Sequence, residues 1–104
     1  MNQEEMFEEL WGILGEEPVE ETTAVLAYEA AHVLEHTMHM KWSKVRSLMD
    51  EKDFKIHRAY AKSELADVLV QAKIVARKLG CTLDELLELG TEKALARLEG
   101  ESKA

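Results

Sequence analysis

Two carboxylates stand three residues apart in the run SELADVLVQAKIV, and their spacing suits metal chemistry. Glu64 and Asp67 would project from the same face of a helix, because residues at i and i+3 are neighbours on its surface. Apolar residues surround Asp67, so an unpaired carboxylate there is costly, and two adjacent carboxylates repel. A bound cation removes both penalties, and Mg²⁺ prefers oxygen ligands. The pair therefore indicates a cation site, with a solvent-facing acidic stripe or neutralisation by Lys or Arg as the alternatives.

A second group of candidate ligands lies upstream. Glu29 and His32 also stand at i and i+3, and His36 and His39 continue the same polar side. His32 and His36 have the i, i+4 spacing that can bind zinc from one helix. No Cys or Glu–His signature completes a tetrahedral zinc set, so this spacing alone is weak support for a zinc site. Antiparallel packing of the two helices would bring Glu29 and His32 opposite the downstream carboxylates.

Helices must position these residues, because no stretch of the chain alternates as a strand would. The expected helices span residues 3–14, 20–40, 53–79 and 83–98, followed by a frayed tail over residues 99–104. Residues 41–52 fit either a short helix or a structured loop. Capping boxes are expected at Asn2 with Glu5 and at Thr82 with Glu85, while Gly15 suits a left-handed residue after the first helix. Gly80 ends the third helix, and Gly90 interrupts the fourth at a cost of up to ~1 kcal/mol.

The apolar spacing predicts how these helices pack. One side of the 20–40 helix is apolar or small: Leu26, Ala27, Ala30, Val33, Leu34, Thr37 and Met38. The 53–79 helix has a broad apolar face: Phe54, Ala61, Leu65, Val68, Leu69, Ala72, Ala76 and Leu79. Small residues on the earlier helix would let another helix approach closely. We therefore expect one all-α domain over residues 1–104, a four-helix bundle.

Charge is unevenly distributed along this acidic chain. The net charge of the 104 residues is −8. Residues 1–40 contain ten Glu and no Lys or Arg, whereas residues 41–62 carry seven Lys or Arg against three acidic residues. An acidic protein repels a phosphate backbone, which argues against general nucleic-acid binding. A solvated loop and helix start explain the basic segment, although it could also hold a small anion.

Location can be predicted from composition. The single cysteine, Cys81, cannot form an internal disulfide, and a reducing compartment fits it best. No stretch approaches the ~18 consecutive apolar residues of a membrane-spanning helix. The start of the chain lacks the basic and apolar regions of a signal peptide. We expect a cytoplasmic protein without membrane contact.

Over roughly residues 20–98 the chain resembles the MazG-like superfamily of all-α nucleoside triphosphate pyrophosphohydrolases. The family pattern is EExxE on one helix and ExxD on the next long helix. The run Glu64-Leu65-Ala66-Asp67 matches the second half, and residues 78–85 resemble the family's turn into its last helix. In the first half Glu29 takes the second family Glu, while Tyr28 replaces the first and His32 the third. A rival register places His32 and Glu35 on the second and third.

The resemblance implies a Mg²⁺-dependent hydrolase that cleaves a nucleoside triphosphate between the α and β phosphates. The products would be a nucleoside monophosphate and pyrophosphate. Four metal ligands are implied: Glu29, His32, Glu64 and Asp67. Four residues of the basic segment would bind the phosphates or stack on the base: Lys41, Trp42, Lys44 and Arg46. Tyr60 is the alternative to Trp42 for stacking on the base. The family generally forms dimers or tetramers, so a homodimer or homotetramer is expected.

The histidine at position 32 changes the expected chemistry. An imidazole in place of a carboxylate removes one negative charge and favours softer, borderline ions, so Mn²⁺ would be accepted more readily. The alternative is a non-catalytic helical module that binds a nucleotide or metal, or that serves in assembly. No residue of the sequence selects a particular base.

Overall fold

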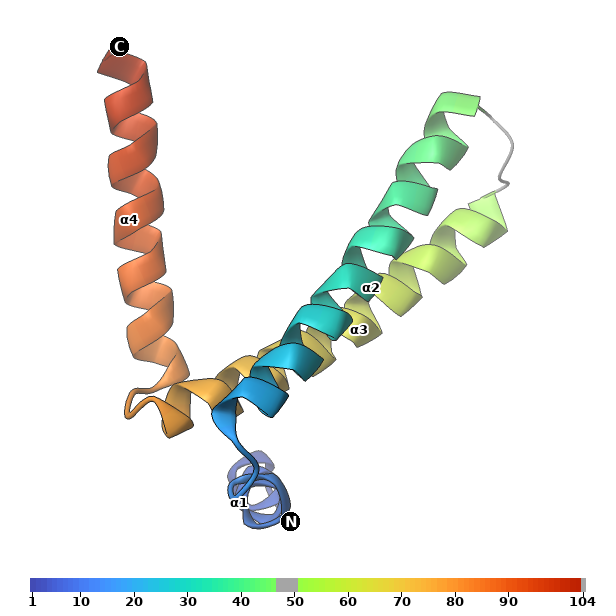
Figure 1. The fold of residues 1–104 in the computed structure, drawn as a ribbon. Helices are drawn as coiled ribbons and strands as arrows, with labels where there is room; N and C mark the ends of the chain where they lie inside the picture. Colours follow the sequence, from blue (N-terminus) through green and yellow to red (C-terminus); the bar gives the residue numbers. More distant parts are fainter. Residues whose placement is uncertain (47–50, 104) are drawn as a thin grey trace.

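The computed structural model describes residues 1–46 and 51–103, and all regular structure in these ranges is α-helical (Figure 1). The helices are α1 (Gln3–Leu14), α2 (Val19–Arg46), α3 (Glu51–Lys78) and α4 (Leu83–Lys103). This confirms the all-α class. None of the described helices combines the length and apolar character needed to cross a membrane.

Two helices extend well past their expected C-terminal ends. α2 passes residue 40 and continues to Arg46, because the run KWSKVR contains neither Gly nor Pro to end it. α4 extends to Lys103, so the prediction of a frayed tail is wrong for residues 99–103. Gly90 and Gly100 lie within α4, and the cost of about 1 kcal/mol for each does not break it. Positions 47–50 of the uncertain 41–52 segment lie outside the described residues.

α2 and α3 pack against each other as an antiparallel hairpin (Figure 1). Three contacts fix the register. Lys78 Nζ lies 2.7 Å from Thr22 Oγ1, His32 Nδ1 lies 3.7 Å from Glu64 Oε2, and His36 Nδ1 lies 3.1 Å from His57 Nδ1. The residue number therefore falls along α3 as it rises along α2. Such packing was the arrangement needed to bring the two candidate ligand groups together.

We define the seam as the line of buried and half-buried residues, alternately four and three apart, along which the two helices meet. On α2 these are Thr22, Leu26, Glu29, Val33, His36 and Met40. On α3 they are His57, Ala61, Glu64, Val68, Gln71, Val75 and Lys78. Alternating spacings of four and three give the seven-residue repeat of coiled-coil packing. Unlike an ordinary coiled coil, this seam places carboxylates and imidazoles between the helices.

The expected apolar faces of these two helices are only partly buried, and several of their large side chains remain exposed. Leu34, Leu65 and Leu69 are 61%, 48% and 47% exposed. The small residues Ala27 and Ala30 are exposed too, so no helix of the described chain packs on them. The seam mixes polar side chains with apolar ones of the expected faces, namely Leu26, Val33, Ala61 and Val68, and the rest of the hydrophobic surface is left on the outer sides. Among the described residues, the buried hydrophobic side chains are Ile74 and Ala76.

α1 lies at the end of the hairpin where α3 finishes and attaches through side chains of α3. Arg77 Nη1 donates to Glu8 Oε1 at 2.6 Å, and the Arg77 guanidinium lies 4.5 Å from the ring centre of Trp11. Lys73 Nζ lies 4.0 Å from the ring centre of Phe7. Cations over aromatic faces are attractive, so basic residues of α3 hold the acidic, aromatic α1.

The ends of the helices follow local sequence signals in most cases. The Asn2 side chain accepts from Glu5 N at 2.8 Å, and Glu5 Oε1 accepts from Asn2 N, which confirms that capping box. Thr82 Oγ1 accepts from Glu85 N at 3.1 Å, as expected at the start of α4. These bonds satisfy N–H groups that the first turn of a helix leaves unpaired.

Gly15 does not take the left-handed conformation expected of it. Its φ is −64°, within the right-handed helical region. A Cβ added at Gly15 would lie 2.6 Å from Trp11 O and 2.9 Å from Trp11 Cε2. The position therefore needs glycine because the Trp11 ring and backbone approach it closely, a requirement that sequence spacing does not reveal.

Gly80 takes the left-handed conformation that allows α3 to end and α4 to leave in a new direction. Its φ is 82°. Cys81 N donates to Ala76 O at 2.9 Å and Gly80 N donates to Arg77 O at 3.1 Å. This pair of bonds is the Schellman motif, in which glycine avoids the clash that a Cβ meets at positive φ.

Alanine at Gly80 and at Gly90 should act in opposite directions. A Cβ built at either position has nothing within 4 Å, so backbone conformation alone decides the effect. At Gly80 the positive φ should make Gly80→Ala destabilising by about 1–2 kcal/mol. In the helix interior, Gly90→Ala should stabilise α4 by up to ~1 kcal/mol. Melting followed by circular dichroism measures both effects, and equal shifts would contradict the assignment of Gly80 to a left-handed cap.

Candidate metal centre between α2 and α3

Three side chains predicted as ligands converge on the seam near the middle of the hairpin. Glu29 and His32 come from α2, and Glu64 comes from α3. One ligand atom from each lies within 4.8 Å of the ligand atoms of the other two. All three residues are half-buried, so the group is partly shielded from water and still open to it. This spacing suits a single ion held between two helices.

One oxygen of Glu64 lacks a hydrogen-bond partner. Its Oε2 atom is buried and accepts no hydrogen bond in the structure. The nearest nitrogen of His32 is 3.7 Å away, which is longer than a hydrogen bond. A buried acceptor without a partner costs free energy, and a charged one costs more. A cation bound between the three side chains would supply the missing interaction.

The electrostatics of Glu29 point the same way. Its pKa is raised above the ordinary value, first because its protonated carboxyl group bonds to Glu64 and second because burial disfavours the charge. The negative charges of Glu64 and Asp67 raise it further, whereas His32 lowers it. Glu29 therefore holds a proton more tightly than an isolated carboxyl group does, and protonation would lower the negative charge of the site.

In the metal-free protein, this shift should make stability decrease as the pH rises. A carboxyl group whose pKa is higher in the folded state holds its proton more tightly there than in the unfolded chain. Its contribution is fully present below the unfolded pKa and is lost as the pH rises through the raised, folded pKa. Glu29→Gln should remove this dependence, while the exposed Glu88→Gln should keep it. Urea unfolding with a chelator, across the carboxyl titration range, measures the difference; identical pH profiles for both variants would contradict it.

The other expected site residues lie elsewhere. Asp67, almost one turn beyond Glu64 on α3, is exposed and outside the three-residue group, and it acts on Glu29 through charge. Glu35 is also exposed and outside the group, so the geometry agrees with the register based on Glu29. Lys41 is exposed on α2, where the helix carries it toward the end of the hairpin. The side chains of Trp42, Lys44 and Arg46 lie outside the described residues.

His57 on α3 was not anticipated from the sequence. Its ring lies 5.4 Å from that of His36 and 4.9 Å from that of His39, measured between ring centres. A signal for this position exists, because His57 stands seven residues, two helical turns, before Glu64. Residues at that spacing share a helix face, so Glu64 could have led to His57.

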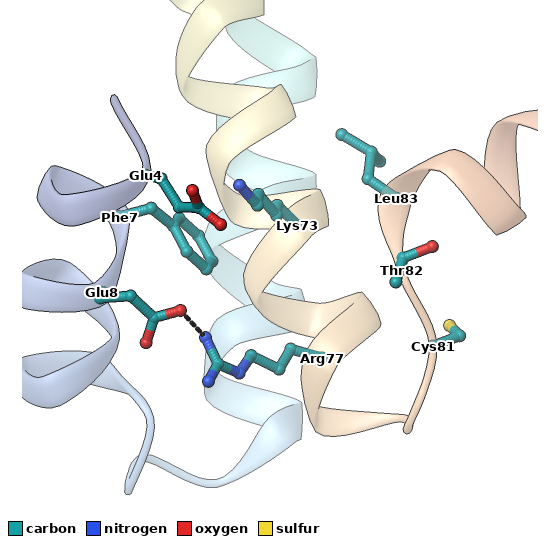
Figure 2. Close-up of a pocket in the computed structure, with 8 residues that line it drawn as sticks. All are labelled: Glu4, Phe7, Glu8, Lys73, Arg77, Cys81, Thr82 and Leu83. Carbon is teal, nitrogen blue, oxygen red and sulfur yellow. Dashed lines mark hydrogen bonds and ion pairs between the residues drawn. The ribbon is translucent and has the colours of Figure 1, made fainter. Parts of the chain in front are cut away.

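A separate hollow of about 280 Å³ lies between α1, α3 and the start of α4 (Figure 2). Figure 2 shows Arg77 reaching across it to Glu8, with Glu4 on the α1 side and Lys73 facing it from α3. Its acidic and basic groups are mixed, and Arg77 is already paired. Lys73 stands nine residues after Glu64, about half a turn from it around α3, so this hollow faces away from the carboxylate group. We assign it to packing of α1 on α3.

No protein family, curated protein or solved structure matches this chain in sequence or structure comparisons. The chemistry of the site must therefore be inferred from its own residues.

Proposed function

We propose that this protein is a metal-dependent nucleoside triphosphate pyrophosphohydrolase, which releases a monophosphate and pyrophosphate. The observation that supports it most is the convergence of Glu29, His32 and Glu64 from two helices. These are three of the four ligands that the resemblance to the MazG-like superfamily implies. Their meeting point at the seam supports that chemistry, and Glu29 and Glu64 match the family pattern, whereas His32 stands where the family has a Glu.

The donor set fits a divalent cation. Two carboxylates and one imidazole offer oxygen and nitrogen, and the buried Glu64 Oε2 has no hydrogen-bond partner. The pKa of Glu29 is raised by its hydrogen bond to Glu64, by burial and by the charges of Glu64 and Asp67. Oxygen ligands suit Mg²⁺, and an imidazole beside them makes Mn²⁺ acceptable as well. When bound, the ion would supply neutralisation of the polyphosphate and a lowered pKa for a coordinated water.

Different side chains would bind the metal ion and attract the phosphates. Glu29, His32 and Glu64 would hold the ion at the seam. Basic residues of the 41–62 segment would attract the phosphates electrostatically, since Lys41, Lys52, Arg58 and Lys62 are exposed. Lys62 stands two residues from Glu64, and the other three lie farther toward the end of the hairpin. Carboxylates for the metal ion and basic residues for the phosphates thus lie on the same hairpin, as a metal-bound nucleoside triphosphate would require.

A panel of nucleoside triphosphates assayed with Mg²⁺ and with Mn²⁺ tests this proposal. Pyrophosphate and monophosphate should appear together with wild type and with the Glu88→Gln control, and should be lost with Glu64→Gln. His32→Glu should shift the preference from Mn²⁺ toward Mg²⁺, because a carboxylate is the harder ligand. Metal binding without turnover of any nucleotide would instead favour the non-catalytic binding module.

The exposed apolar surface supports a homo-oligomer as part of the same proposal. The chain exposes 8048 Å², whereas a compact protein of 11.8 kDa exposes roughly 5,900 Å². The difference, about 2,100 Å², exceeds the ~800 Å² that each partner buries in a standard interface. A second copy packed on the outward faces of α2 and α3 would cover the exposed leucines there and leave the polar seam as a site.

Sedimentation at micromolar concentration should show at least a dimer. Leu69→Glu should shift the protein toward the monomer, because a charge would be buried in the proposed interface. Ile13→Glu places the same charge on α1, where the side chain is exposed and outside that interface, and should leave the assembly unchanged. A monomeric wild type would contradict the prediction, and so would equal effects of the two variants.

A further inference from the structure

All four histidines of the chain lie on α2 and α3, and three of them form a second cluster. His36 and His39 on α2 meet His57 on α3. This cluster is closer than the carboxylate group to the last residue of α2 and the first residue of α3. This cluster has no role in the function proposed above. Its residues are half-buried, as the members of the first group are.

The closest contact joins two imidazole nitrogens from different helices. His36 Nδ1 and His57 Nδ1 are 3.1 Å apart. Two neutral rings can make one hydrogen bond at this distance if one nitrogen carries a proton and the other does not. Nitrogens that bind one metal ion also approach in this way. With metal–nitrogen bonds of about 2.0–2.1 Å, they lie roughly 2.9 Å apart at a right angle and roughly 3.4 Å apart at the tetrahedral angle.

Ring contacts hold the pair in place. The His39 ring stacks on His57 with centres 4.9 Å apart and planes 14° from parallel. The Tyr60 ring stacks on His36 with centres 5.3 Å apart and planes inclined by 30°. Each of the two facing imidazoles is thus supported by a neighbouring ring, which reduces the freedom that would be lost on binding an ion.

The donor chemistry differs from that of the carboxylate group. Neighbouring residues along the seam are apolar, namely Val33, Met40 and Ala61. Imidazole ligands in such surroundings select Zn²⁺, Ni²⁺ or Cu²⁺ over Mg²⁺, which prefers oxygen. We propose that His36 and His57 form a separate Zn²⁺-type site that clamps α2 to α3, with water completing the coordination. This site is independent of the nucleotide chemistry and does not require the carboxylate group.

Calorimetric titration of the full chain with Zn²⁺ tests the proposal, in the Glu64→Gln background and with excess Mg²⁺ to suppress the first site. One Zn²⁺ should bind, and Zn²⁺ should raise the melting temperature. Adding His57→Gln or His36→Gln should weaken binding by at least about tenfold, since even outer-shell partners of a metal contribute that much. Adding His32→Gln, a matched change on the same helix, should leave Zn²⁺ binding unchanged.

Circular dichroism shows whether each variant keeps its helices, and the two histidine variants serve as independent checks on each other. Zn²⁺ binding that survives both substitutions in folded proteins would overturn the proposal. Absence of Zn²⁺ binding in the Glu64→Gln background would also overturn it, and would leave His36 and His57 as a hydrogen-bonded pair. Neither result would affect pyrophosphate release, so failure of this site is distinguishable from failure of the proposed function.

Discussion

Saturating Mn²⁺ or Mg²⁺ should raise the melting temperature of the wild-type protein, and Glu64→Gln should remove most of that gain. A ligand that binds only the folded state stabilises it by about 2.7 kcal/mol at a hundredfold excess over Kd. For a domain of this size, each kcal/mol shifts the melting temperature by roughly 4–8 °C. The expected gain is therefore on the order of 10–20 °C.

Without metal, the same substitution should be neutral or stabilising. Glu64 Oε2 is buried without a hydrogen-bond partner and lies beside a second carboxyl group, so removing its charge relieves repulsion. If Glu64→Gln is more stable than wild type without metal and less stable than wild type with metal, Glu64 is a metal ligand and not an ordinary structural residue. Glu88→Gln should behave as wild type, and Asp67→Asn should keep most of the gain because Asp67 lies outside the group. An unchanged melting temperature of wild type on adding either ion would contradict the metal site.

Ile74→Ala should be the most destabilising single truncation of an aliphatic side chain. Ile74 has no exposed surface, and it is the largest fully buried side chain among the described residues. Truncating a buried isoleucine to alanine removes apolar contacts and leaves a cavity, at a cost of about 2–5 kcal/mol. With so little other buried hydrophobic surface, this chain has few contacts to compensate for the loss.

Ile13→Ala supplies the matched control, because it makes the same chemical change on a helix where the side chain is 70% exposed. Its effect should stay within about 0.5 kcal/mol. Urea unfolding of both variants at one protein concentration measures the contrast. Similar losses would mean that Ile74 is not the centre of the core, or that a partner copy buries Ile13.

Local features were predictable from the sequence where a single residue carries the signal. Asn2 and Thr82 cap helices through their own side chains, and Gly80 takes the positive φ that other residues avoid. The end of α2 was not predictable in this way, because no Gly or Pro marks it. The continuation of α4 was not predictable either, because the helix tolerates Gly90 and Gly100. Gly15 shows a different limit, since its requirement comes from the Trp11 ring and not from its own φ.

The site was predictable in part, for a geometric reason. Spacing along a helix identifies which side chains share a face, and it correctly grouped Glu29 with His32. It cannot say how far a facing helix is rotated, and that rotation decides that Glu64 enters the group while Asp67 remains outside. Periodicity also identified the apolar sides of α2 and α3. It did not reveal that Leu34, Leu65 and Leu69 on these sides stay exposed, because a pattern does not specify whether the partner surface belongs to the same chain.

The exposure of α4 determines where the chain can unfold locally. Every residue from Asp84 to Glu101 is exposed, and the helix extends away from the hairpin after the Gly80 turn (Figure 1). Its backbone bonds therefore lack the support of tertiary packing, and isolated helices of this kind are only marginally stable in water. Opening of α4 breaks none of the contacts in the seam, so its amide hydrogens can exchange with solvent through local unfolding while the hairpin stays folded. The free energy of that opening is set by α4 alone, until another surface covers its leucines.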